Sequence, residues 1–299
     1  MATRWRSAQR RSLEVDLSTC STVSCGAESV TGCVAEVFVA SHAETVPWTG
    51  RRRLMFISPR MENAMGEQAF KEVMRTEKIL PPTDPMAKAV ARVGRKIAAN
   101  SPGLPWQFHV IDEEEPNAFC IPGGRIFVHS GLFKILRNED GLAAVLFHEA
   151  AHGLARHGAE TISLSMFING LLALLFPDNG YFSRLLVRLV VDLPYSRNLE
   201  MEADAIGLQL MAKACYDPRE SAKMNEALGR LHQSEQLTKY VSTHPPSYER
   251  AEAIRMKLGD ALAIFEEGNC HAKRAAFDQV VSTDNPQRQP PTDTTCDVR

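Results

Sequence analysis

The segment from Asn138 to His152 constrains the fold of this chain most strongly, because its composition is that of a helix beginning at a defined residue. Asn138 is a favourable N-cap, and the acidic residues Glu139 and Asp140 suit the positive end of a helix dipole. Leucine and valine at 142–146 then supply an apolar face. The sequence therefore predicts a helix packed into a core, with two histidines in its last turns.

These histidines, His148 and His152, are four residues apart. On an α-helix this spacing brings both imidazoles to one face, one turn apart, where they can share a metal ion. A Zn²⁺ ion would lie about 2.0–2.1 Å from one nitrogen of each ring. Glu149 lies roughly 100° around the helix from His148, beside the metal but outside its ligands. That is where a general base for hydrolysis belongs, so we expect one Zn²⁺ per chain with Glu149 as the base.

A catalytic zinc needs a third protein ligand and an open position for water. Glu200 and Asp204 are four residues apart in a segment that also reads as helical, so one helix would present both. Glu200 would ligate the metal, and Asp204 would accept a hydrogen bond from the far nitrogen of a ligating histidine. Spacing alone leaves Glu202 open as the ligand.

The rest of the chain predicts a fold that is mainly α with a small β-sheet, an α+β architecture. A helix capped by Asp84 and opened by Pro85 is expected to end near Asn100. Helices also dominate the chain after Ser130. A further helix is predicted before Asp84, over 61–79. Three short strands are predicted over 106–111, 117–121 and 125–129.

The composition bounds the possible functions. The chain has 299 residues, is 44% hydrophobic and 23% charged, and has a formal net charge of −2. A dedicated nucleic-acid binder would normally be basic, so we exclude one. The seven cysteines are odd in number and form no C-x-x-C pair, so unpaired thiols are the expectation.

The two ends differ from the middle, and we expect a leader at 1–45, a peptidase domain at 46–277 and a disordered tail at 278–299. Four arginines and no acidic residue precede Glu14. This composition is typical of a mitochondrial transit peptide, although a disordered basic tail would also fit.

An apolar stretch of fifteen residues runs from Ile162 to Phe176. As a helix it would be about 22 Å long, shorter than the roughly 30 Å hydrocarbon core of a bilayer. Together with a second apolar run ending at Leu193, it predicts either a buried helical hairpin or a membrane-associated segment over 162–193.

Four further motifs occur with the histidine pair: V-P-W-T-G-R-R at 46–52, N-A-F-C-I-P-G-G-R-I-F-V at 117–128, Y-S-R-x-x-E-x-E-A-D at 195–204 and S-T-H-P at 242–245. In this order, over roughly 46–258, the chain resembles the gluzincin peptidases related to the CAAX prenyl protease and HtpX. Among these it is most similar to the mitochondrial inner-membrane metalloendopeptidases whose activity overlaps that of the matrix-facing AAA protease.

The resemblance implies a zincin-like core and chooses Glu200 over Glu202 as third ligand. It implies that an edge strand containing Asn117, Ala118 and Phe119 binds substrate through main-chain hydrogen bonds. It also draws attention to His244, which would either stabilise the oxyanion or cap the open metal position in a resting state; the alternative is a histidine in a surface turn.

The function expected from this resemblance is zinc-dependent hydrolysis of peptide bonds in membrane-associated proteins, in quality control at the inner mitochondrial membrane. Substrates would include dynamin-like GTPases, lipid contact is expected, and a homo-oligomer is possible. Two alternatives are a non-catalytic zinc-containing scaffold or chaperone-like binder, and a peptidase of the bacterial envelope.

The remaining candidates are given structural roles. Arg250 is expected to form a structural ion pair. His157 follows His152 by five residues, so it is expected to point away from the metal face, either solvated or as a cation at the helix C-terminus. His109 and His129 lie in predicted strands, and Cys120 is expected to pack as a small apolar residue.

Overall fold

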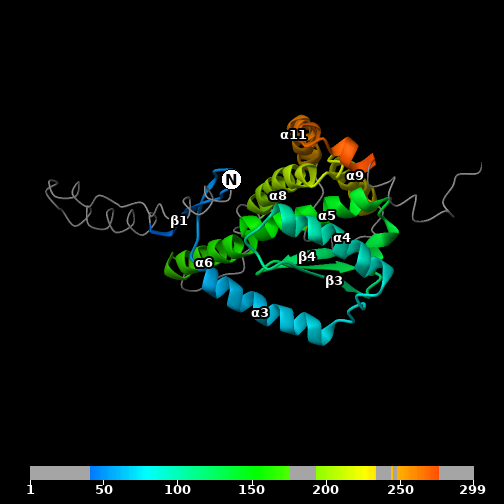
Figure 1. Ribbon diagram of the computed structural model, residues 1–299. Helices are drawn as coiled ribbons and strands as arrows, with labels where there is room; N and C mark the ends of the chain where they lie inside the picture. Colours follow the sequence, from blue (N-terminus) through cyan, green and yellow to red (C-terminus); the bar gives the residue numbers. More distant parts are fainter. Residues whose placement is uncertain (1–40, 176–192, 234–243, 245–247, 276–299) are drawn as a thin grey trace, which may run out of the picture. The chain divides into compact units, whose positions relative to one another are not determined.

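The computed structural model describes residues 41–175, 193–233, 244 and 248–275 (Figure 1). The chain divides into two compact units, Met1–Ala43 and Glu44–Arg299, and the features below belong to the second unless stated otherwise. Most of the predicted leader, residues 176–192 of the predicted apolar segment 162–193, and the predicted tail lie outside the described residues.

The described elements occur in the order β1 (Ala43–Thr45), β2 (Arg52–Leu54), α3 (Pro59–Thr76), α4 (Pro85–Asn100), β3 (Gln107–Ile111), β4 (Ala118–Ile121), β5 (Arg125–His129), η2 (Ser130–Lys134), α5 (Glu139–Ala155), α6 (His157–Leu175), α8 (Leu193–Lys213), α9 (Arg219–Gln233) and α11 (Tyr248–Glu267). The predicted α+β class is confirmed, and each of the three predicted strands is found within one residue of its predicted bounds.

The three longer strands form one sheet in the order β3-β5-β4. β3 is parallel to β5, and β4 is antiparallel to it. Helices α4 and α5 cover one face of the sheet, while α3 crosses the other (Figure 1). Among the described strands β4 pairs on one side only, so it is an edge strand that packs against α5.

Helix α5 is the centre of the core. It begins as predicted, with the Asn138 side chain accepting a hydrogen bond from the backbone of Gly141 at 2.8 Å. Every residue from Asp140 to Ala151 is buried, so the helix is enclosed on all sides rather than on one apolar face. The histidine pair therefore lies in the interior of the domain.

Helix α8 packs closely along α5, and Gly207 permits this approach. A Cβ at Gly207 would lie 3.0 Å from the carbonyl oxygen of Phe147, tighter than ordinary van der Waals contact. The absent side chain thus brings the backbone of α8 directly against the turn of α5 that carries His148. This contact determines how far the acidic residues of α8 stand from the histidines of α5.

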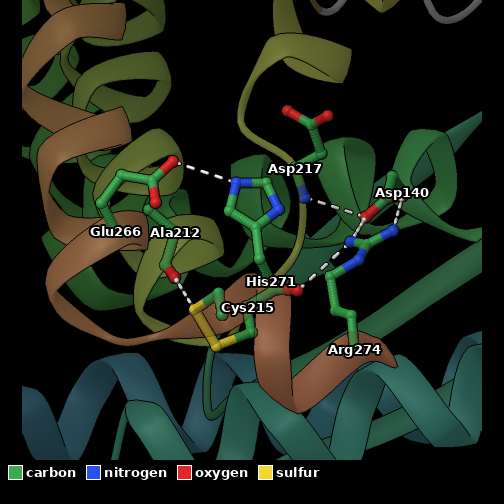
Figure 2. Close-up of a disulfide and its surroundings, with 8 residues drawn as sticks. Asp140, Ala212, Cys215, Asp217, Glu266, His271 and Arg274 are labelled. Carbon is green, nitrogen blue, oxygen red and sulfur yellow. Dashed lines mark hydrogen bonds and ion pairs between the residues drawn. A yellow bond between two sulfur atoms is a disulfide. The ribbon is translucent and has the colours of Figure 1, made fainter. Parts of the chain in front are cut away.

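A disulfide joins Cys215, at the end of α8, to Cys270, just beyond α11 (Figure 2). The expectation of unpaired thiols is therefore wrong for these two residues, although Cys120 is free. The cysteines are 55 residues apart in sequence and meet because α8 and α11 pack against each other. Arg274 reinforces the junction by pairing with Asp140, at the start of α5, at 2.6 and 2.8 Å.

The part of the predicted apolar segment that is described belongs to α6. Its side chains are not uniformly buried: Met166 is 53% exposed and Phe167 is 40% exposed. Within the described ranges, no helix combines the length and the apolar character needed to cross a membrane.

Candidate active site

Four side chains meet where α5 and α8 pack together. The Nε2 atoms of His148 and His152 lie 3.1 Å apart. Glu200, on α8, places Oε2 3.3 Å from the first of these nitrogens and Oε1 3.2 Å from the second. His244 joins them with Nδ1 3.1 Å from Glu200 Oε2. All four donor atoms lie within 4.8 Å of one another, and we refer to these residues as the four-residue cluster.

This cluster fits a metal ion in both chemistry and size. Ligand atoms about 2.0–2.1 Å from a tetrahedral ion are roughly 3.3 Å from one another. The contacts among His148, His152 and Glu200 are 3.1, 3.2 and 3.3 Å. Two imidazole nitrogens and one carboxylate are also a common donor set for catalytic zinc. A cation among them would satisfy buried polar atoms that otherwise face one another.

The charges of the cluster are set by burial and by its acidic members. Burial lowers the pKa of His152 to about 3, so this ring is neutral and has a lone pair to share. Burial acts in the same direction on His148, but in the metal-free site Asp204 and Glu200 outweigh it and raise its pKa to about 10. A metal ion bound at Nε2 of His148 would therefore displace a proton from this ring. Although Glu200 is also buried, the neighbouring histidines hold its pKa well below the usual range, so it is an anion.

Glu149 lies beside the cluster, as its position on the helix predicts. It is 1% exposed, and Oε1 is 3.4 Å from Nε2 of His244. The backbone of Cys120, on the edge strand β4, acts to lower the pKa of the same carboxylate, but burial outweighs it. Burial raises the pKa of Glu149, which increases the affinity of the carboxylate for a proton. A buried carboxylate of this kind, next to a metal site, can take a proton from a reacting water.

Asp204 lies behind His148, with Oδ1 2.9 Å from Nδ1 of the ring. The two atoms are within ion-pair distance, although the oxygen is not aligned with the ring N–H as a hydrogen bond requires. Arg250 holds the Asp204 carboxylate with two contacts of 2.8 and 2.9 Å, and it also reaches Glu200 at 3.0 Å. The ion pair predicted for Arg250 is confirmed.

The expectation that His157 faces solvent is wrong. Arg156 has left-handed backbone angles, with φ 57° and ψ 38°, and so ends α5 before His157. The helical geometry used to predict the direction of His157 does not apply beyond that break. The ring is 2% exposed, and its Nδ1 is 3.0 Å from Nδ1 of His152. Only the tertiary structure reveals this contact, because Arg156 carries no sequence signal for a helix end.

Glu202 does not enter the four-residue cluster. Its carboxylate is instead 3.1 Å from Nε2 of His157, and Arg51 donates to it at 2.7 and 2.9 Å. Thr49 also donates a hydrogen bond to it. Of the two glutamates left open by spacing, Glu200 is thus the one that lies beside the two histidines.

The other predicted residues lie nearby or in the sheet. Ala118 and Phe119 belong to the edge strand β4. Asn117 directly precedes this strand, and its carbonyl accepts a hydrogen bond from the backbone N–H of His129. His129 also contacts the carbonyl of Glu115, and His109 stacks on Phe127. Neither of these two histidines belongs to the cluster.

The chain is similar to known proteins over most of its length. A family model described as Peptidase family M48 matches residues 85–257. The mitochondrial metalloendopeptidase OMA1 of Schizosaccharomyces pombe is 38% identical over 243 residues, which are 79% of this chain and 72% of that protein.

Two more distant relatives extend the likeness. The mitochondrial metalloendopeptidase OMA1 of Homo sapiens is 32% identical over 268 residues, covering 80% of this chain and 50% of that protein. The Beta-barrel assembly-enhancing protease of Escherichia coli is 28% identical over 241 residues, covering 74% of this chain and 49% of that protein. This chain therefore spans about half the length of these two relatives.

Proposed function

The chain belongs to peptidase family M48 and is a metalloendopeptidase, and on that premise we propose that it uses a Zn²⁺ ion held by His148, His152 and Glu200. The observation that carries this assignment is the set of 3.1–3.3 Å contacts among the donor atoms of these residues. They come from two helices pressed together at Gly207, so the donor set is held by packed backbone rather than by a loop.

The proposed reaction is hydrolysis of an internal peptide bond. Bound zinc would polarise the scissile carbonyl and lower the pKa of the attacking water. Glu149 takes the proton from that water and passes it to the leaving amine. Its burial and raised pKa support this role, since a base with greater proton affinity removes a proton from water more readily.

His244 has two possible roles in this scheme. Its Nδ1 lies at a ligand-like 3.3 Å from Nε2 of His148, which supports a cap over the open metal position in a resting state. Its Nε2 lies on the side of Glu149, which supports stabilisation of the oxyanion after the ring turns towards substrate.

Substrate would bind along β4 as an added strand. The register of β4 with β5 pairs Ala118 with Val128 and Phe119 with Phe127. Because main-chain groups alternate in direction along a strand, those of Ala118 and Cys120 point towards the unpaired edge. The backbone of Cys120 lies close enough to Glu149 to act on the pKa of this carboxylate, so that edge runs beside the proposed catalytic base. An extended peptide paired there would therefore pass the metal site.

The cellular setting is inferred from the relatives. The OMA1 proteins are named as mitochondrial, which supports a mitochondrial location for this chain. Within the mitochondrion we propose the inner membrane, with the bacterial envelope as the alternative location. Its substrates would be membrane-associated proteins, including dynamin-like GTPases. The exposed Met166 and Phe167 on α6 support a segment near the active site that lies against lipid.

The test is a comparison of wild-type protein with Glu149→Gln. Zinc content is measured by mass spectrometry and proteolysis with fluorescently labelled, unfolded casein. We expect one zinc per chain in both proteins and a loss of activity of at least about 100-fold in the variant. Glu226→Gln, which alters an exposed carboxylate paired with Arg255, is the matched control and should keep full activity. A zinc-loaded Glu149→Gln protein with wild-type activity would exclude Glu149 as the base.

The non-catalytic scaffold expected as an alternative would need a closed metal site, and His244 offers the cluster the fourth donor atom that such a site requires. A structural zinc site has four protein ligands and no open position. Under that alternative neither wild-type protein nor Glu149→Gln cleaves casein, although both bind zinc. Comparing the proteins cleaved in mitochondria that contain one or the other form would then separate a scaffold from a peptidase with narrow specificity.

A further inference from the structure

The two histidines proposed as ligands are supported in different ways. His148 has a carboxylate directly behind it, that of Asp204, at 2.9 Å. His152 instead faces a third imidazole, with its Nδ1 3.0 Å from Nδ1 of His157. A carboxylate also supports His152, but His157 lies between the two: the carboxylate of Glu202 is 3.1 Å from Nε2 of His157.

The contacts of His157 are consistent with one assignment of hydrogen-bond donors and acceptors. If Nε2 of His152 binds the metal, its proton is on Nδ1 and can be donated only to an acceptor. Nδ1 of His157 is such an acceptor when the proton of that ring is on Nε2. That proton then points to Oε2 of Glu202 at 3.1 Å. Both rings are thus in a single tautomer, and each N–H has a partner.

Glu202 is held as an anion by the segment that follows β1. Arg51 donates two hydrogen bonds to Glu202 Oε2. The same guanidinium is held by Glu160, which is fully buried, through contacts of 2.6 and 2.8 Å. Glu202 is therefore fixed in position and in charge, as a terminal acceptor should be.

We propose that His157 is a positioning residue for the metal site. It orients the ring of His152, and it is itself held in place by Glu202, which Arg51 fixes. The proposal rests on the assignment of His152 as a metal ligand. Outer-sphere partners that orient a ligand typically contribute 10- to 100-fold to metal affinity. The residue does not contact the reacting atoms, so its effect reaches the metal only through His152.

The experiment measures metal binding rather than activity. Full-length wild-type protein is compared with His157→Ala, His157→Gln, Glu202→Gln and the double variant His157→Ala with Glu202→Gln. Zinc affinity is obtained by competition with a chromophoric chelator, ligand geometry from the visible absorption bands of the Co²⁺-substituted protein, and folding from circular dichroism and Tm. His129→Gln is the matched control, because His129 is similarly buried but lies in β5, outside the cluster.

We expect His157→Ala to lose 10- to 100-fold in zinc affinity and to shift the Co²⁺ bands. His157→Gln should recover part of this loss, since an amide can accept from His152 and donate to Glu202. Replacing Glu202 as well as His157 should lower the zinc affinity little more than replacing His157 alone, because the two residues act on His152 through one series of contacts.

Unchanged zinc affinity and unchanged Co²⁺ bands in His157→Ala would overturn the proposal. So would an equal loss of affinity in His129→Gln, which would indicate general destabilisation. These results do not depend on proteolysis. A failed Glu149→Gln test can therefore be distinguished from a failure here: the first concerns the proton transfer, and the second concerns the orientation of a ligand.

Discussion

Glu200 and Glu202 are two residues apart on α8, which separates their side chains by roughly 200° around the helix. Glu200 and Asp204, four residues apart, share a face instead. One helix thus supplies a carboxylate to the four-residue cluster, a second carboxylate behind His148, and a third that reaches His157 from another direction. Residues of one chemical type have different roles because the helix turns them towards different neighbours.

The Glu202 carboxylate predicts a pH dependence of stability. Burial alone would raise its pKa, but His157 and Arg51 outweigh burial and lower it from 4.5 to about 2. The folded chain therefore binds this proton less readily than the unfolded chain. The stabilisation is complete above pH 4.5 and is lost as the pH falls towards 2.

Comparing the Tm of wild-type protein and Glu202→Gln, both without added metal, isolates this effect. Wild-type protein should have the higher Tm at pH 7, and the difference should shrink as the pH falls from 4.5 to 2. A difference that stays constant over this range would mean that Glu202 does not stabilise the fold as a charged group.

At the scale of elements, local signals predicted the starts of α4 and α5 and the end of α4, but not the end of α5. Asp84 and Asn138 are cap residues that the structure confirms, because a cap acts within one turn of its own helix. The end of α5 has no such signal, since Arg156 takes the left-handed conformation that usually favours glycine. Spacing therefore predicted that His148, Glu149 and His152 lie close together on α5. The position of His157 depends instead on a break in the helix that tertiary contacts stabilise.

Those contacts predict a difference between two substitutions at Arg156. Its side chain pairs with Glu62 at 2.6 Å and with Glu44 at 2.9 Å, and both Arg156→Gly and Arg156→Ala lose these pairs. Only alanine also retains the steric cost of a left-handed backbone, about 1 kcal/mol. We expect the glycine variant to be the more stable of the two by about that amount in urea unfolding. If alanine is equally stable or more so, the backbone at Arg156 does not determine where α5 ends.

At the scale of the whole domain, α5, α8 and the chain around α11 meet near the disulfide (Figure 2). α8 carries Glu200 and Asp204, and α11 carries Arg250, which binds both. The bond between Cys215 and Cys270 joins the ends of these two helices. No local pattern identified this pair, because the two cysteines are brought together by helix packing and not by their spacing.

The disulfide should stabilise the fold chiefly by restricting the unfolded chain. A closed loop with a sequence separation of 55 corresponds to about 4 kcal/mol on the loop-entropy model. For a domain of this size, that change lowers Tm by on the order of 10 °C. We expect a phosphine reductant to lower the Tm of wild-type protein by this amount and Cys270→Ser to reproduce the effect. The reductant should cause no further change in Cys270→Ser, since Cys215 then has no partner to release. A wild-type Tm that does not change, with reduction verified by counting free thiols, would show that packing between α8 and α11 holds this junction without the covalent bond.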